Sequence, residues 1–168
     1  VSRAVALVGF AGIRNMAMSL VLVEHMHDKA HANQLKEEFL RALMAGMLAS
    51  ELSAILRESE EAFIGAMFQN LGRLLTEYYF AEEARQVRGI VAASCPGGAA
   101  ASEESAAVSV LGLSFEALGL GVAKAWGLPD TLQHCMRRPK GEPPTREPAE
   151  SGERLRWLTF AANQIADT

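Results

Sequence analysis

The sequence predicts an all-α protein, a compact bundle of about seven to nine helices. Ala (28) and Leu (20) far outnumber Val (10) and Ile (5), and the abundant pair forms helices well, whereas β-branched residues favour strands. Apolar residues recur at helical spacing along most of the chain, and no segment alternates as a half-buried strand does. Ser, Gly and Pro stand where helices commonly begin and end.

Length, charge and cysteine content together indicate a single domain in the cytoplasm. The 168 residues suffice for one domain, residues 1–168, with a sizeable core. The net charge of −4, with acids and bases interspersed, gives no reason to expect nucleic acid or a membrane as a partner. Cys95 and Cys135 stand alone, which fits neither a zinc motif nor a disulfide framework and indicates free thiols in a reducing compartment.

An apolar run over residues 5–13 resembles the core of a signal peptide. It lacks a basic leader and a cleavage-type ending, and Arg14 and Asn15 interrupt it well short of a membrane span. We therefore expect a buried helix. Arg14 and Asn15 need polar partners there, so they are candidate interaction residues, at a junction with further N-terminal helices or with another domain.

The first helices are expected before residue 28. Gly9 divides the apolar stretch, so a short helix ends near Val8 and a longer one spans residues 10–27. Residues 16–23 are apolar nearly all round, which is typical of a central, fully packed helix. The polar stretch 25–34 is expected to close it.

Two long helices are expected next, over residues 35–57 and 60–79. Ser59 is a candidate N-cap, with Glu60 and Glu61 favourably placed in the first turn. The residues expected to face the core are Phe39, Leu43, Met47, Leu48, Phe63, Met67, Leu71, Leu74, Leu75 and Tyr78. A further helix covers residues 81–94, and the Cys-Pro-Gly-Gly sequence after it ends it.

The remaining elements are short helices with recognisable ends. Ser102 begins a helix to Leu111, and Ser114 caps one that ends at Trp126-Gly127, where Gly suits a left-handed C′ position. A short helix follows over residues 129–138. Residues 139–152 are rich in proline and are expected to form a mobile loop. The last helix spans residues 153–166, with Leu155, Leu158, Phe160 and Ile165 towards the core.

Three segments in register resemble one family. Residues 61–74 (EAFIGAMFQNLGRL) look like a helix that carries a His-Asp-x-Gly-Lys signature. Residues 111–119 (LGLSFEALG), followed by residues 125–129 (AWGLP), are similar to a Gly-x-x-His-x-x-x-Gly and Trp-Gly-Leu-Pro pair. Residues 4–17 look like an Ala-x-x-x-Leu-Gly helix pair. Together they resemble the HDOD family, the degenerate relatives of HD-type metal-dependent phosphohydrolases.

That family carries further helices before the Ala-x-x-x-Leu-Gly segment. The chain begins with Val1 and enters the hydrophobic pattern almost directly. We therefore expect it to be part of a longer protein that supplies those helices. An apolar surface left without them would be a route to homodimers.

The resemblance also implies where metal ligands would lie. HD enzymes need imidazoles and carboxylates that converge on one or two divalent ions. The corresponding positions here hold residues of other kinds: Ala42, Gln69, Asn70, Phe115, Pro139 and Lys140. Neutral amides, a methyl group and an aromatic ring do not hold and bridge cations. The sequence therefore predicts no catalytic residues, no bound metal and no cofactor.

The resemblance implies a non-catalytic regulatory module of bacterial signal transduction. Such modules work beside receivers, kinases or cyclic-dinucleotide enzymes, through binding of a partner or ligand. Two alternatives stay open: a small-molecule sensor that binds a nucleotide through Gln69 and Asn70, and a residual metal-dependent phosphohydrolase. The simpler interpretation of the two amides is that they cap or cross-link helices, because buried amides must find hydrogen bonds.

Other polar groups have a structural and a functional interpretation. His25, His27 and His31 could bind a metal, but an exposed polar helix end explains them more simply. His134 has no nucleophile in a recognisable arrangement and is expected to face solvent or a neighbouring helix. The basic residues Arg137, Arg138, Lys140, Arg154 and Arg156 are interpreted as solvated surface rather than as a phosphate site.

Three glycines also have two interpretations. Gly112, Gly119 and Gly121 could suggest a phosphate loop. They lie in a helical context without a preceding strand, so we interpret them as points of close helix packing.

Overall fold

The computed structural model describes residues 29–53, 56–93, 102–146, 148 and 150–168. The helices expected before residue 28, with Arg14, Asn15, His25 and His27, lie outside the described residues. Within the described ranges the chain forms eight helices and no strand, which confirms the predicted all-α bundle. The helices are α2 (Lys29–Leu52), α3 (Leu56–Gln69), α4 (Leu71–Tyr79), α5 (Ala81–Ala93), α6 (Glu103–Leu111), α7 (Phe115–Ala125), α8 (Asp130–Met136) and α9 (Ser151–Ala166).

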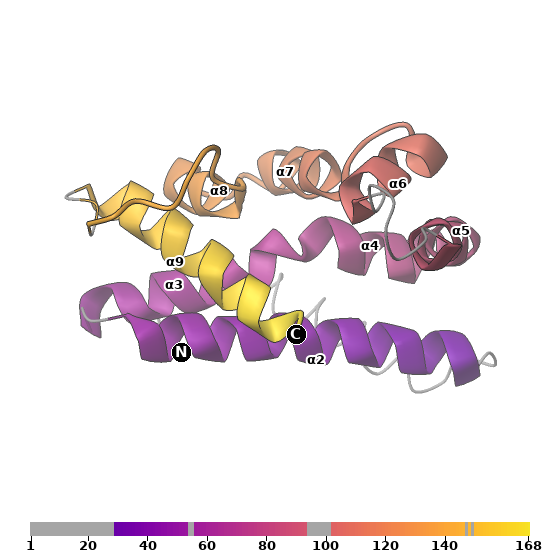
Figure 1. Ribbon diagram of the computed structural model, residues 1–168, viewed down its shortest axis with the longest axis horizontal. Coiled ribbons are helices and arrows are strands. Elements are labelled where there is room, and N and C mark those ends of the chain that lie inside the picture. The colour runs from indigo at the N-terminus through magenta and orange to yellow at the C-terminus, as the bar shows by residue number, and fades with distance from the viewer. Residues whose placement is uncertain (1–28, 54–55, 94–101, 147, 149) are drawn as a thin grey trace.

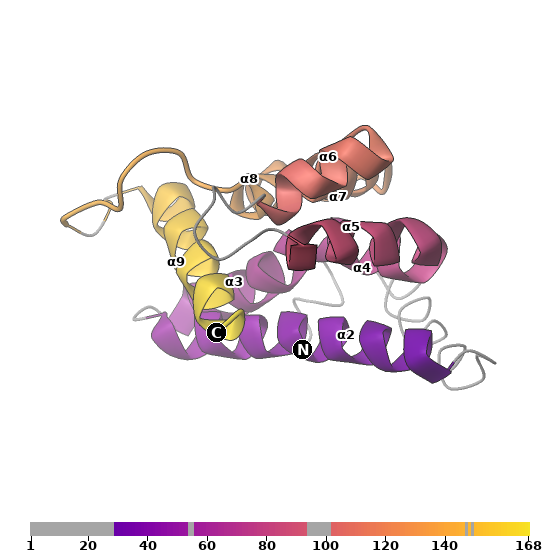
Figure 2. The ribbon, with the colours of Figure 1, turned by 45° about the vertical axis from the view of Figure 1, so that its right-hand side comes forward.

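The described helices form three layers (Figures 1 and 2). Helix α2 forms one layer, α3, α4 and α5 form the middle layer, and α6, α7 and α8 form the third. Helix α9 crosses the layers from the end near α8 back to α2 (Figure 1). Helix α9 therefore packs against both α2, the first described helix, and α3 in the middle layer.

Helix α2 begins and ends earlier than the sequence predicts. It covers Lys29–Leu52, so the polar stretch expected to be a break is helical from Lys29 onward. Ala32 and Leu35 are buried against Leu74 and Tyr78, and this contact supports the additional turns. The predicted N-cap at Ser59 is also wrong, because α3 begins at Leu56.

The helix predicted over residues 60–79 is divided at Asn70. The backbone N–H of Asn70 donates to the carbonyl of Met67, 3.1 Å away, instead of the carbonyl four residues earlier. That earlier carbonyl, of Ala66, accepts from the Asn70 side-chain amide at 3.2 Å. The side chain of Asn70 thus replaces one backbone hydrogen bond of the helix, and asparagine commonly interrupts helices in this way. The break turns α4 away from α3.

The predicted caps of the later helices are confirmed. Ser102 and Ser114 have extended backbones, and their hydroxyls accept from the N–H groups of Ser105 and Ala117 at 3.2 and 3.1 Å. Gly127 has a φ of 69° just after α7, as its expected left-handed conformation requires. These short helices therefore have locally encoded ends.

Helices α4 and α7 cross at a point where both carry glycine. A β-carbon on Gly72 would lie 1.9 Å from the carbonyl oxygen of Phe115, and one on Gly119 would lie 3.0 Å from the Gly72 nitrogen. Close packing is thus confirmed for Gly119. A β-carbon on Gly121 would have nothing within 4 Å, and Gly112 ends α6 with a φ of 79°. The prediction of close helix packing is therefore wrong for Gly121 and Gly112.

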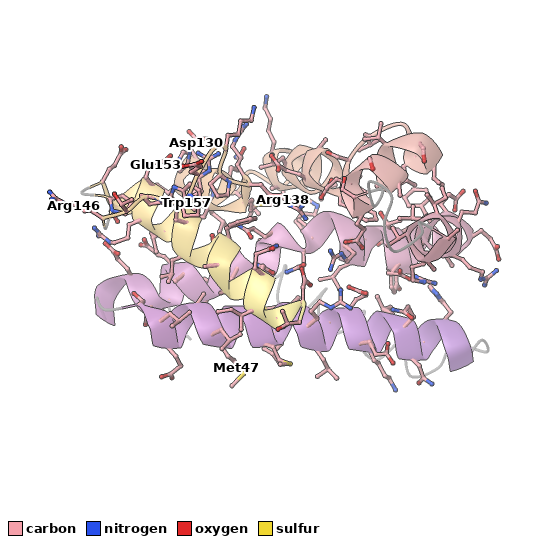
Figure 3. All side chains as sticks on the ribbon, viewed as in Figure 1. Met47, Asp130, Arg138, Arg146, Glu153 and Trp157 are labelled. Carbon is pink, nitrogen blue, oxygen red and sulfur yellow. The ribbon has the colours of Figure 1, made fainter. Side chains whose placement is uncertain are left out.

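The core is rich in alanine, which lets the helices approach closely. One cluster joins α2, α3, α8 and α9, and its buried members are Ala45, Ala49, Ala62, Ala66, Cys135, Leu155 and Ala162. Two residues predicted to face the core are exposed instead: Met47 is 57% exposed and Ile165 is 51% exposed. Met47 points away from the bundle (Figure 3).

The loop after α8 is exposed over Lys140–Arg146, and α9 begins at Ser151, inside the range predicted for the loop. In the described part of the chain no single helix is long and apolar enough to cross a membrane. Helices α6 and α7 would pass as one broken span by length and composition, with a bend of 69° between them.

Candidate functional site

Gln69 and Asn70 lie where α3 ends, against α8 and α9. The amide of Gln69 donates to the carbonyl of Cys135 at 2.7 Å and to the hydroxyl of Thr159 at 2.9 Å. Thr159 is fully buried, and its hydroxyl also lies 3.2 Å from the Cys135 carbonyl. Gln69 therefore links the end of α3 to both α8 and α9.

Asn163, one turn after Thr159 on α9, completes the network. Its amide nitrogen donates to the carbonyls of Ala66 and Thr159 at 3.0 and 2.9 Å and to the side-chain oxygen of Gln69 at 2.9 Å. Its oxygen accepts from the Asn70 amide at 2.5 Å. Backbone carbonyls can only accept, so Asn163 cannot turn its amide around without facing oxygen with oxygen.

We call the four side chains Gln69, Asn70, Thr159 and Asn163 the amide joint. Their donors meet acceptors within a largely buried junction, and satisfied groups of this kind hold neighbouring elements in one arrangement. The joint contains no carboxylate and no imidazole. Its chemistry is that of a structural cross-link between helices, as the simpler interpretation of Gln69 and Asn70 predicts.

The other positions implied by the resemblance lie on α2, at the start of α7 and in the loop after α8. Ala42 is fully buried on α2. The ring of Phe115, at the start of α7, packs in a separate cluster with Val87, Ala106 and Ala107. Lys140 is exposed in the loop after α8. The backbone carbonyl of Phe115 nevertheless lies against Gly72, two residues after Asn70, and Glu116 lines the same pocket as Gln69 and Asn70.

A charged cluster lies one turn beyond the joint. Arg73 is 6% exposed and contacts carboxylates from three elements: Glu103 at the start of α6, Glu38 of α2 and Asp167 after α9, the last two at 3.6 Å. Arg41 lies 3.5 Å from both Glu38 and Asp167. The cluster thus fastens α4 to α2, α6 and the end of α9.

The pKa values in this cluster follow from burial and charge. Burial alone would lower the pKa of Arg73, but the carboxylates of Glu103, Glu38 and Asp167 raise it. Burial, together with repulsion by Glu38 and Asp167, raises the pKa of Glu103 in spite of Arg73. Arg73 therefore stays charged and serves as the counter-ion of the surrounding carboxylates.

A small pocket opens between the joint and the cluster. It has room for about 20 Å³, which accommodates about one water molecule. Its lining combines amides, two arginines, two carboxylates and two apolar side chains: Gln69, Asn70, Arg73, Glu116, Met136, Arg138, Phe160, Asn163, Gln164 and Asp167. Its opposite charges balance, so it presents no strong field to an ion of either sign.

No metal centre is formed by the residues that the structure describes. Among them, no three His, Cys, Asp or Glu side chains are grouped as metal ligands. His31 is buried, so its interpretation as part of an exposed helix end is wrong. His134 faces a neighbouring helix as expected, with its Nε2 atom 2.9 Å from Glu153.

Two of the basic residues that were predicted to be solvated surface, Arg154 and Arg156, instead make hydrogen bonds to other elements. Arg154 holds Glu58 through both carboxylate oxygens, at 3.1 and 2.5 Å. Arg156 donates to the carbonyls of Arg137 and Arg138, at 3.1 and 2.8 Å. Glu153 and Trp157 lie in the same region, where α9 begins beside α8 (Figure 3). These side chains fasten α9 to its neighbours.

Cys135 supplies its carbonyl to the amide joint while its thiol lies in the core, 3% exposed. Burial raises the pKa of this thiol to about 11, so almost no reactive thiolate forms near neutral pH. In a Cys95→Ser variant, we expect Cys135 to react with Ellman's reagent at pH 8 only as fast as the protein unfolds. Reaction at the rate of an exposed cysteine would contradict the packing of α8.

Several residues of this region were not identified as candidate site residues from the sequence. Thr159 and Asn163 stand at helical spacing on the face of α9 that also carries Leu155 and Ala162. Polar residues on an apolar helix face are a signal that could have found them. Arg73 follows Gly72 in an apolar helix and carries the same signal. Glu38 and Asp167 are ordinary surface residues by pattern, so only the fold identifies them.

A comparison with known families matches this chain to one model. The family model for the HDOD domain matches residues 1–140. No curated protein and no solved structure matches the chain. The matched range includes Gln69, Asn70 and Arg73, and it ends before α9, which supplies Thr159 and Asn163.

Proposed function

Because the chain belongs to the HDOD domain family, we propose that it is a non-catalytic regulatory module of bacterial signal transduction that binds a protein partner. The partners that fit this role are receivers, kinases or cyclic-dinucleotide enzymes, in the same chain or in another. Its place of action would be the cytoplasm. A homodimer is one form in which it would act.

The amide joint is the observation that supports this proposal most strongly. The resemblance puts Gln69 and Asn70 at the positions of the His-Asp pair, and their amides hold α3 against α8 and α9. A hydrolase of the HD type needs charged oxygen ligands and imidazoles at that place. Neutral amides that already bond Asn163 supply neither negatively charged ligands nor a general base.

The proposed mechanism is a change in the relative position of helices. A binding partner shifts the balance between two arrangements only as far as it prefers one of them. The amide joint fixes α3, α8 and α9 as one unit, and the arginine cluster connects that unit to α4 and α6. A partner that contacts either side would thereby influence the other.

The test is an activity screen combined with reconstituted binding. We expect no turnover of phosphomonoesters, phosphodiesters or cyclic dinucleotides in the presence of Mn²⁺ or Mg²⁺. We also expect a purified receiver or kinase, first found with the chain as bait, to bind it saturably in calorimetry. Metal-dependent turnover that disappears in a Gln69→Ala variant would contradict the proposal.

A second candidate, a small-molecule sensor, would have to bind in the pocket beside Arg73. Arg73 and Arg138 line this pocket, but both guanidinium groups already contact carboxylates, and the amide nitrogen of Asn70 already donates to Ala66 and Asn163. Its room of about 20 Å³ is far below that of a nucleotide. Calorimetric titration with a nucleotide panel should therefore give no saturable binding, whereas binding that Asn70→Ala abolishes would favour the sensor.

A further inference from the structure

Helix α6 is held in place by few apolar contacts. Its buried side chains are Ala106 and Ala107, which pack with Val87 of α5 and Phe115 of α7, and its larger side chains Val110 and Leu111 are only partly buried against the same cluster. Alanine contributes little apolar area compared with Leu or Phe. Val108, on the outer face of α6, is 48% exposed. Burial alone therefore fixes this helix less firmly than it fixes α3 or α9.

The first turn of α6 carries two adjacent glutamates that reach other helices. Glu103 contacts Arg73 of α4. Glu104 lies 3.2 Å from Arg138, which follows α8, and its carboxylate accepts from the backbone N–H of Glu116 at 3.5 Å. We call these contacts the clasp. They connect α6 to α4, to α7 and to the segment after α8.

Arg73 and Arg138 each keep another way to balance their charge when α6 moves away. Arg73 keeps Glu38 and Asp167, each at 3.6 Å, and loses one of three carboxylates that repel one another. Arg138 is 45% exposed, so water can solvate its guanidinium. Opening the clasp therefore leaves no buried charge without a partner, which keeps its cost low.

We propose that α6 is a detachable cover whose attachment depends on the contacts of Glu104 with Arg138 and with the start of α7. When α6 detaches, the side chains of Val87 and Phe115 lose their cover while the amide joint stays closed. A helix with two positions of similar free energy is the kind of element through which binding energy is transmitted. This inference rests on the contacts of α6 and not on the identity of any partner.

The test is hydrogen exchange of the amides of residues 106–111. In the wild-type protein they should exchange faster than those of α3 and α9. Glu104→Gln should speed their exchange about threefold further and leave α3 and α9 unchanged. Arg138→Gln leaves the sequence of α6 intact and should give about a threefold increase.

Glu82→Gln is the matched control, because Glu82 pairs within α5 with Arg85 at the surface. It should leave α6 unchanged. Faster exchange in Glu104→Gln but not in Arg138→Gln would overturn the proposal, since it would trace the effect to the helix dipole alone. Equal loss of protection in every helix would also overturn it, because α6 would then open only with the whole protein.

Discussion

Replacing Gly72 with alanine should destabilise the protein by about 3–5 kcal/mol. The added β-carbon would lie 1.9 Å from the carbonyl oxygen of Phe115 and 3.0 Å from the nitrogen of Gly119. Both neighbours are backbone atoms, so no side-chain rotation can relieve the contact and α4 must separate from α7. The free energy of unfolding in urea, measured against the wild-type protein, gives the effect directly.

Gly121→Ala is the control on the same helix pair. Gly121 lies within α7, and a β-carbon there would have nothing within 4 Å. Alanine is the better helix former, so this change should raise stability by about 0.5–1 kcal/mol. A Gly72→Ala variant as stable as the wild type would show that α4 and α7 do not cross as described.

The second large effect is expected from Asn163→Asp, which should cost about 2–4 kcal/mol at pH 7. The amide nitrogen of Asn163 faces three acceptors: the carbonyls of Ala66 and Thr159 and the side-chain oxygen of Gln69. A carboxylate of the same shape turns these three contacts from attraction into repulsion. Asn163 is 8% exposed, so water cannot replace the lost bonds.

The loss should depend on pH in a defined direction. Repulsion in the folded state raises the pKa of the introduced carboxyl above its unfolded value of about 3.9. The folded state then binds the proton more tightly, so the deficit is largest at neutral pH and shrinks on acidification. The neighbouring change Gln164→Glu adds the same charge at an exposed position and should alter stability by less than about 0.5 kcal/mol. Equal losses in both variants would contradict the amide joint.

The helical class and the ends of the later helices were predictable because they are encoded locally. Ser102 and Ser114 cap helices through their own hydroxyls, and Gly127 ends α7 with a positive φ. The family could also be recognised from the segments around Gln69 and Phe115, and the HDOD family model matches residues 1–140, which include both. Signals of this kind need no knowledge of the tertiary structure.

The errors have tertiary causes. Asn70 divides one predicted helix into two because its side chain takes the Ala66 carbonyl and bonds Asn163 on α9. Met47 fits the helical pattern of α2 but lies on the exposed face. The amide joint and the arginine cluster join residues up to 126 positions apart, and sequence periodicity carries no information about such pairs.

The central claim is that Gln69 and Asn70, which the resemblance puts at two of the metal-ligand positions, form part of a hydrogen-bonded joint between helices. The most direct test is elemental analysis of the purified chain after incubation with excess Mn²⁺ and removal of unbound ions. The account predicts no stoichiometric metal, because amides already engaged with Thr159 and Asn163 offer no charged ligand. About one tightly bound metal ion per chain, lost in a Gln69→Ala variant, would contradict it.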